Sequence, residues 1–167
     1  MLLTNYIKNL HYKNQYSFYE KAFVLFLTPF SFAYNIIIQF RLLLYKHNLL
    51  KSYTPSAKVI SIGNLTSGGT GKTPITYEFA KFLSQNHSTA IISRGYKRQS
   101  NSPFCLVRTP EKMTQTDPHN CGDEPYMLAS LLKKTTVLTS SNRTLIAKKA
   151  VEDYQSHILI LDDGYQH

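Results

Sequence analysis

The stretch KVISIGNLTSGGTGKTPITYEFAKFLSQ, residues 58–85, decides the fold of this chain. Residues 58–62 are rich in β-branched side chains and predict a strand. Residues 74–85 carry apolar side chains at helical spacing, and Pro74 falls in the first turn, where its missing N–H leaves no bond unmade. The stretch therefore predicts a strand, a glycine-rich loop and a helix in direct succession.

The loop has the composition of a phosphate-binding turn. Phosphate oxygens need backbone N–H groups at close range, which glycines without a Cβ allow, and they favour a helix N-terminus. Lys72 adds a charge for the outer phosphates, and Thr73 adds a hydroxyl for Mg²⁺. Thr66 stands where the GxxxxGK[ST] pattern has glycine, and a chance GKT in a turn is the alternative. The predicted phosphate-binding residues are Thr66, Ser67, Gly68, Gly69, Thr70, Gly71, Lys72 and Thr73.

Downstream, short β-rich runs alternate with helical patterns, which is typical of a parallel sheet covered by helices. The expected strands are 88–93, 135–140 and 157–161, and the expected helices are 124–133 and 143–154. Residues 94–122 are predicted to be a polar loop with a short strand at 104–107. We therefore predict an α/β fold, with a P-loop NTPase-type parallel sheet flanked by helices over residues 58–167.

Several polar residues follow predicted strands, where parallel α/β sheets bind ligands. Asp162 ends an apolar strand and predicts a carboxylate beside Mg²⁺, although many strands end in Asp at a turn. Arg94 and Tyr96 follow the strand at 88–93. Arg143 begins a helix, where it either reaches a phosphate or is a solvated surface arginine.

Asp123 and Glu124 open another predicted helix. Paired acids at that position often only complement the helix dipole. The functional interpretation is a general base that takes a proton from an attacking hydroxyl, with the neighbouring acid near the metal.

The N-terminal segment, residues 1–57, is basic and apolar. Seven of the 19 Lys and Arg lie in residues 1–58, against one of the 10 Asp and Glu. This charge points to an anionic partner, either a membrane surface or nucleic acid, and no nucleic-acid-binding motif accompanies it.

Residues 22–40 carry no charge and approach the length of a membrane span, but Pro29 is expected to break or kink a helix there. Flanking basic and aromatic residues favour a helix at the membrane interface. A single crossing and a buried core helix are the alternatives. The sequence argues against a cleavable signal peptide, because the apolar run starts late and no small-residue cleavage site follows it.

The motifs together resemble the lipid A 4'-kinase (tetraacyldisaccharide 4'-kinase) family. The matching stretches are residues 63–74 with their Thr66 variant, Ser93-Arg94-Gly95-Tyr96, Gly122-Asp123-Glu124-Pro125 and Asp162-Asp163-Gly164-Tyr165-Gln166-His167. The resemblance implies transfer of the γ-phosphate of ATP to the 4'-hydroxyl of a tetraacylated glucosamine disaccharide 1-phosphate. It implies ATP and Mg²⁺ as cofactors and a place on the cytoplasmic face of the bacterial inner membrane, peripheral or held by a single N-terminal anchor. It implies no nucleic-acid or protein partner.

The resemblance also assigns roles. Asp123 matches the catalytic base, Lys72 and Arg143 match catalytic positions, and Thr73, Glu124 and Asp162 match residues near the metal. Asn64, Arg94, Tyr96 and Asp163 match substrate-binding or further active-site positions.

Family members are about twice as long, so the chain is expected to be truncated, with an incomplete sheet, an unpaired apolar edge and little or no activity alone.

One alternative function is that of a membrane-associated P-loop ATPase switch of the partitioning or septum-site kind. Those proteins carry a lysine where this chain has Ser67, which argues against that class. The other alternative is a fragment that binds nucleotide without catalysis.

Overall fold

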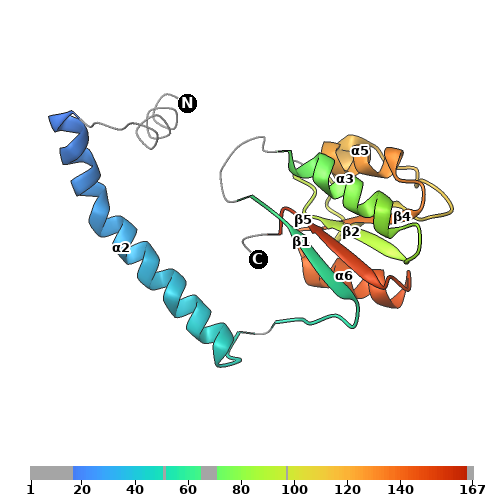
Figure 1. Cartoon of the computed structure of the whole chain (residues 1–167), viewed down its shortest axis with the longest axis horizontal. Helices are drawn as coiled ribbons and strands as arrows, with labels where there is room; N and C mark the ends of the chain where they lie inside the picture. The colour runs from blue at the N-terminus through green and yellow to red at the C-terminus, as the bar shows by residue number, and fades with distance from the viewer. Residues whose placement is uncertain (1–16, 51, 65–70, 97, 165–167) are drawn as a thin grey trace. The chain divides into compact units, whose positions relative to one another are not determined.

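A computed structural model of the chain describes residues 17–50, 52–64, 71–96 and 98–164 (Figure 1). The chain divides into two units, Met1–Ser52 and Tyr53–His167. The sequence predicts a different division, into a basic and apolar segment 1–57 and a nucleotide-binding segment 58–167, and this division stays a prediction.

The described part of the first unit is one long helix, α2 (Phe18–Lys46). At its start the N–H of Ser17 donates to Oε2 of Glu20 at 2.7 Å, which satisfies a donor at the helix end. The predicted break at Pro29 is wrong, because α2 continues through it. The hydroxyl of Thr28, the residue before Pro29, donates to the carbonyl of Val24 at 2.9 Å.

Helix α2 is long and apolar enough to cross a membrane, judged by length and composition. Its 29 residues span about 43 Å at 1.5 Å per residue, and its most apolar window has a mean hydropathy of 1.6. None of that window is buried. The prediction of an N-terminal apolar helix is therefore confirmed.

The second unit is built on a five-stranded sheet with the order β1-β5-β2-β4-β3. The strands are β1 (Lys58–Ile62), β2 (Thr89–Ser93), β3 (Cys105–Arg108), β4 (Thr135–Thr139) and β5 (Ile158–Asp162). Every residue of β2 and β4 is buried, as expected of parallel strands that are covered on both faces. The predicted α/β fold is confirmed.

One strand departs from the predicted parallel order, because β3 pairs antiparallel with β4. The chain leaves β2 at its carboxyl end and reaches β3 through residues 94–104, and no helix lies among the described residues of this segment, 94–96 and 98–104. Without a crossover helix, β3 has to run in the reverse direction. Residues 94–122 also contain a short helix that was not predicted, α4 (Pro118–Cys121).

Helices cover both faces of the sheet (Figure 1). Helices α3 (Lys72–Leu83) and α5 (Asp123–Leu131) lie on one face, over a core that includes Ile91, Leu128 and Ile160. Helix α6 (Arg143–Glu152) lies on the other, over a core that includes Ile92, Ile146 and Leu159. Adjacent residues of one strand enter opposite cores because strand side chains alternate between faces.

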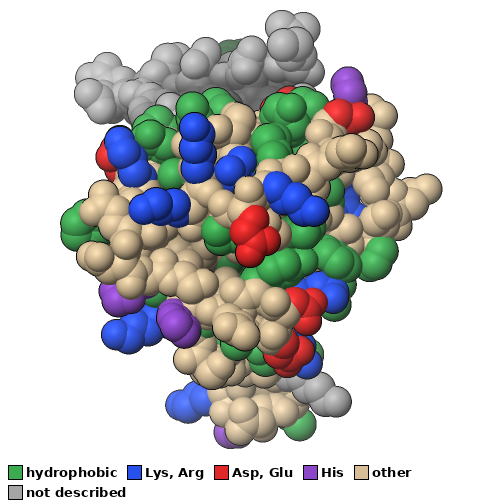
Figure 2. All heavy atoms as spheres, turned by 90° about the vertical axis from the view of Figure 1, so that its right-hand side faces the viewer, with side chains coloured by type: hydrophobic (Ala, Val, Ile, Leu, Met, Phe, Trp, Pro, Cys, Tyr) green, Lys and Arg blue, Asp and Glu red, His purple; other side chains and the backbone are tan. Residues whose placement is uncertain are grey.

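Strand β1 lies at one edge of the sheet. The last described strand, β5, is paired on both sides, with β1 and with β2. The unpaired edge on this side of the described sheet is formed by β1, where Val59 is 44% exposed. Figure 2 shows one face of the molecule, on which Lys and Arg side chains lie among apolar and acidic ones.

Candidate nucleotide-binding site

The predicted site residues lie where the parallel strands end. The strand register pairs Ile62 with Asp162 and Ser93 with Thr139, so the segments that follow these four residues leave the sheet at the same edge. In open α/β sheets ligands bind at this carboxyl edge.

One contact of the site, between Lys72 and Asp163, joins the start of α3 to the segment after β5. Gly71 precedes the helix in the left-handed region, with φ 77°, which glycine adopts without strain. Nζ of Lys72 then lies 2.8 Å from Oδ1 of Asp163. This hydrogen bond raises the pKa of Lys72, and the carboxylates of Asp162 and Glu124 add to the effect. The ammonium group is thus charged and held beside the end of β5.

A second contact from α3 is buried. The hydroxyl of Thr76 donates to Oδ1 of Asp162 at 3.1 Å. Burial raises the pKa of Asp162, and the nearby carboxylates of Glu124 and Asp163 raise it further, whereas the Thr76 hydrogen bond lowers it. Asp162 is therefore a carboxylate in an environment that favours an added cation.

Arg143 approaches the same segment from the opposite face of the sheet. Its Nη2 donates to the carbonyl oxygen of Asp163 at 2.8 Å and to that of Asp162 at 3.4 Å. Burial lowers the pKa of Arg143, and the neighbouring positive charge of Arg94 lowers it further. Its Nε and Nη1 are buried and have no hydrogen-bond partner among the described residues. Arg143 is half-buried and therefore not fully solvated, and its unused donors beside a second arginine suit an anionic group.

The segment after β5 is itself constrained. Asp163 has φ 56°, an uncommon conformation for a residue other than glycine, and the N–H of Gly164 donates to the carbonyl of Ile62 at 3.0 Å. A Cβ on Gly164 would collide with Oγ of Ser61 and would lie 2.9 Å from Cβ of Leu161. The positions of the Asp162 and Asp163 carboxylates therefore depend on contacts with β1, α3 and α6.

Two of the predicted motifs pack against each other through glycines. Gly95 has φ 66° and Gly122 has φ 98°, and a Cβ on Gly122 would lie 3.2 Å from Cα of Gly95 and from the carbonyl oxygen of Tyr96. Only glycine allows these backbones to approach so closely. This contact brings Arg94 and Tyr96 beside the helix that begins with Asp123.

The remaining predicted residues are placed less tightly. Asp123 and Glu124 begin α5 and are exposed. Glu124 is close enough to influence the pKa of both Lys72 and Asp162. Among the described residues, no hydrogen bond or ion pair joins Asp123 to Lys72, Asp162 or Arg143.

Asn64 and Thr73 are half-buried, and Tyr96 is 78% exposed. Asn64 lies two residues after the end of β1, and Thr73 is the second residue of α3. The other predicted phosphate-binding residues, Thr66, Ser67, Gly68, Gly69 and Thr70, lie outside the described residues.

The described carboxylates suit Mg²⁺ better than a metal that needs a cage of side chains. No group of three or more His, Cys, Asp or Glu in the described ranges is arranged to hold a metal ion. Mg²⁺ is commonly bound by only one or two carboxylates together with phosphate oxygens and water. Asp162, Glu124 and the hydroxyl of Thr73 therefore have the donor chemistry for it.

Sequence reasoning missed Thr76 and the role of the two glycines. Thr76 lies one helical turn after Lys72, and it is fully buried on the core side of α3. A buried hydroxyl needs a partner, so this position was a usable signal for a polar contact. Its partner lies 86 residues away, and no local pattern identifies it.

Comparison with known proteins adds a family match. The model of the family described as tetraacyldisaccharide-1-P 4'-kinase matches residues 23–167. A tetraacyldisaccharide 4'-kinase from Halothermothrix orenii is 40% identical over 165 residues, which cover 99% of this chain and 43% of that protein. Another from Desulfotalea psychrophila is 44% identical over 140 residues, covering 83% of this chain and 40% of that protein. The chain thus spans less than half the length of these relatives.

A solved structure agrees with the sequence matches. The crystal structure of LpxK from Aquifex aeolicus in complex with ATP is similar to this chain with a TM-score of 0.72 and 39% identity. The similarity covers 84% of this chain and 44% of that one.

Proposed function

Because the chain belongs to the tetraacyldisaccharide-1-P 4'-kinase family, we propose that its second unit is the nucleotide-binding part of an ATP-dependent kinase. The enzyme transfers the γ-phosphate of ATP to the 4'-hydroxyl of a tetraacylated glucosamine disaccharide 1-phosphate. The observation that carries this proposal is the convergence of Lys72, Thr76 and Arg143 on Asp162 and Asp163.

In this proposal the phosphates of ATP lie at the start of α3. Lys72 exchanges part of its contact with Asp163 for the β- and γ-phosphate oxygens, and the backbone N–H groups of residues 66–73 bind the same oxygens. The LpxK from Aquifex aeolicus was crystallised in complex with ATP, which supports the choice of nucleotide. The unused donors of Arg143 are available for the transferred phosphate.

Mg²⁺ would be held by Asp162, Glu124 and the hydroxyl of Thr73. The ion neutralises charge on the β- and γ-phosphates when it is bound. Asp162 is suited to this role because burial and neighbouring carboxylates already raise its pKa, so an added cation relieves an unfavourable charge. The Thr76 hydroxyl orients this carboxylate.

Asp123 is the proposed general base. The 4'-hydroxyl oxygen attacks the γ-phosphorus, the bond from that phosphorus to the β–γ bridging oxygen breaks, and ADP leaves. The hydroxyl proton passes to the Asp123 carboxylate. An exposed carboxylate at the start of α5 is accessible to a bulky acceptor, and Tyr96 and Asn64 are proposed to help position it.

The lipid nature of the acceptor accounts for the first unit. We propose that α2 lies on or anchors in the cytoplasmic face of the bacterial inner membrane, because it is exposed, apolar and flanked by basic residues. No nucleic-acid or protein partner is proposed.

The test is a chimera that places residues 1–167 in front of the remaining part of the Halothermothrix orenii relative. We expect it to transfer labelled γ-phosphate to the tetraacyldisaccharide 1-phosphate and to lose this transfer with Asp123→Asn. Residues 1–167 alone are expected to bind ATP and to transfer phosphate weakly or not at all.

Three results would count against the proposal. ATP hydrolysis that vesicles stimulate, without a labelled lipid product, would favour the ATPase switch. ATP binding by a chimera that catalyses neither reaction would favour a fragment that only binds nucleotide. Failure of residues 1–167 to bind Mg²⁺ and ATP would overturn the nucleotide site itself.

A further inference from the structure

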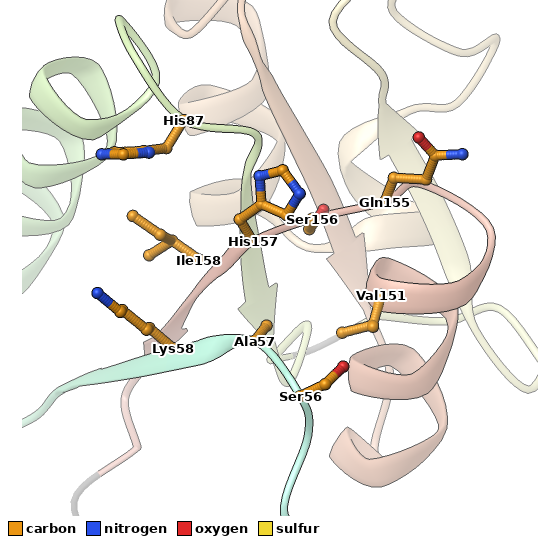
Figure 3. Close-up of a pocket in the computed structure, with 9 residues that line it drawn as sticks. All are labelled: Ser56, Ala57, Lys58, His87, Val151, Gln155, Ser156, His157 and Ile158. Carbon is orange, nitrogen blue, oxygen red and sulfur yellow. The ribbon is translucent and has the colours of Figure 1, made fainter.

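The two ends of the parallel strands differ in how polar groups are arranged around them. Where β1 and β5 begin, a pocket of about 590 Å³ has Lys58 and Ser156 among its lining residues (Figure 3). In Figure 3 the Lys58 side chain extends away from Ser156, so these two groups do not meet on one ligand. At the carboxyl ends of the strands, hydrogen bonds instead connect the segment after β2 to the end of β4 and to the turn before α6.

Arg98 makes the first of these connections. Its Nη1 donates to the carbonyl oxygen of Thr139 at 3.1 Å, and its Nη2 donates to the carbonyl oxygen of Ser102. The backbone N–H of Arg98 donates to the carbonyl of Gly95 at 3.1 Å. Hydrogen bonds from a charged guanidinium are stronger than those between neutral groups. One half-buried arginine therefore ties the segment after β2 to the last residue of β4.

The Arg98 side chain also packs against Gly95. A Cβ on Gly95 would lie 3.3 Å from Cδ of Arg98 and only 2.8 Å from the carbonyl oxygen of Cys121. The space beside this glycine is thus filled by the Arg98 side chain and by the backbone that leads into α5. Arg94 and Tyr96 flank Gly95, so the same contacts determine where their backbone lies.

A second connection reaches the start of α6. Oγ of Ser140 donates to the carbonyl of Pro103 at 2.6 Å and accepts from the N–H of Asn142 at 3.0 Å. The Asn142 side chain in turn accepts from the N–H of Leu145 at 3.1 Å and caps α6. The segment that Arg98 holds is therefore also tied to the turn directly before Arg143.

Arg94 and Arg143 need such a framework because their charges repel each other. Burial lowers the pKa of Arg143, and the nearby positive charge of Arg94 lowers it further. If the segment after β2 were loose, the exposed Arg94 would move away from Arg143 until an anion arrived. Ordering that segment would then be subtracted from the binding free energy of the ligand.

We propose that Arg98 is a positioning residue of the kinase, which acts by holding Arg94 and Tyr96 where they meet the lipid acceptor. The inference rests on the proposed function, in which Tyr96 helps to position the acceptor. Arg98 acts through its neighbours and not by contact with ATP, which is assigned to the start of α3. Loss of its side chain should therefore affect the acceptor more than the nucleotide.

Arg108 provides a matched control. Its guanidinium also donates to two carbonyl oxygens, those of Ala129 at 3.3 Å and Lys133 at 3.4 Å. These bonds join β3 to the end of α5 and leave the segment after β2 untouched. Arg108→Ala therefore removes the same kind of contact from another part of the second unit.

The structural part of the test needs no activity. Hydrogen exchange of residues 1–167, followed by mass spectrometry, compares the unchanged chain with Arg98→Ala and Arg108→Ala. We expect Arg98→Ala to speed exchange in residues 94–104, where the lost bonds no longer hold the backbone. Arg108→Ala should leave the exchange of this segment unchanged.

The functional part uses the chimera with the Halothermothrix orenii relative. Arg98→Ala should raise the KM for the tetraacyldisaccharide 1-phosphate about tenfold, the size of one charge-assisted hydrogen bond, and change the KM for ATP less than about twofold. Arg98→Lys can reach only one of the two carbonyls and should give an intermediate KM. In a chimera that already lacks the side chains of Arg94 and Tyr96, Arg98→Ala should add less than about threefold, because its effect passes through them.

Three results would overturn the proposal. One is exchange in residues 94–104 that Arg98→Ala leaves unchanged. The second is an equal rise of both KM values, or an equal effect of Arg108→Ala, because the loss would then be one of general stability. The third is a full tenfold effect of Arg98→Ala in the absence of the Arg94 and Tyr96 side chains. An unsubstituted chimera that transfers no phosphate would instead count against the proposed function, whereas the exchange rates decide independently whether Arg98 holds the segment.

Discussion

Thr76 and Asp162 share a buried hydrogen bond of 3.1 Å that joins α3 to the end of β5. The bond determines where the Asp162 carboxylate lies relative to Lys72, because both α3 residues lie on neighbouring turns of one helix. The position of the proposed metal ligand therefore depends on a residue that touches neither ATP nor Mg²⁺ in the proposed reaction.

Thr76→Val removes this hydrogen bond while it keeps the shape of the side chain. We expect the free energy of unfolding to fall by about 1–3 kcal/mol, because a buried carboxylate oxygen loses its donor. Urea denaturation measures the loss. Thr76→Ser retains the hydroxyl, so it should keep the affinity for Mn²⁺ used in place of Mg²⁺, whereas Thr76→Val should weaken it. Equal Mn²⁺ affinity in all three proteins would contradict a positioning role.

Asp162→Asn should make the chain more stable at neutral pH. Burial raises the pKa of Asp162 above 3.8, so at neutral pH the native state carries a charge that its surroundings disfavour. This destabilisation is complete above the raised pKa, and it declines as the pH falls through that pKa toward 3.8, because the native carboxyl becomes protonated first. The stability advantage of Asp162→Asn should therefore shrink on acidification, and an advantage that grows would contradict the assignment.

Lys72→Ala should weaken ATP binding about 10- to 100-fold, because charge-assisted hydrogen bonds to phosphate are lost. The stability of the chain should change by no more than about 1 kcal/mol, since the partner carboxylate of Asp163 is 68% exposed. Fluorescence titration with an ATP analogue and urea denaturation give the two values. Lys81→Ala, on the same helix, is the control, and an equal loss of ATP affinity there would argue against a specific role for Lys72.

Gly122→Ala and Gly71→Ala compare crowded and open glycines with positive φ. Gly71 has φ 77° and ψ 22°, with nothing described within 4 Å of an added Cβ, so its substitution should cost about 1–2 kcal/mol. Gly122 has φ 98° and ψ 147°, and an added Cβ would meet Gly95 at 3.2 Å. We expect Gly122→Ala to cost about 3 kcal/mol or more in thermal or urea unfolding. Equal costs would show that the contact between the two motifs relaxes easily.

Cys121 should resist alkylation in the native chain. Burial raises its pKa to about 11, so only about one molecule in a thousand carries the thiolate at pH 8. Mass spectrometry after iodoacetamide treatment should find Cys105 modified well before Cys121, because Cys105 is only half-buried. Urea should equalise the two rates, and rapid native modification of Cys121 would contradict the buried environment.

Much of the second unit was predictable because its signals are local. The strand at 58–62 was predicted at its observed bounds, and the helix after the loop was predicted to begin at Pro74 where α3 begins at Lys72. Side-chain periodicity and the turn preferences of glycine and proline act over a few residues, so a single sequence carries them in full. Short apolar runs such as Ile158–Leu161 are also typical of a strand that is covered on both faces.

By itself the sequence determined the α/β class, the order of the elements along the chain, the phosphate-loop motif and the family. The tertiary structure alone decided the strand order, the reversal of β3, the contact between Thr76 and Asp162 and the contact between Arg98 and Thr139. These features join residues that are far apart in the sequence, and their energies depend on which surfaces are buried together. A local pattern contains no information about a partner that approaches only when the whole sheet has formed.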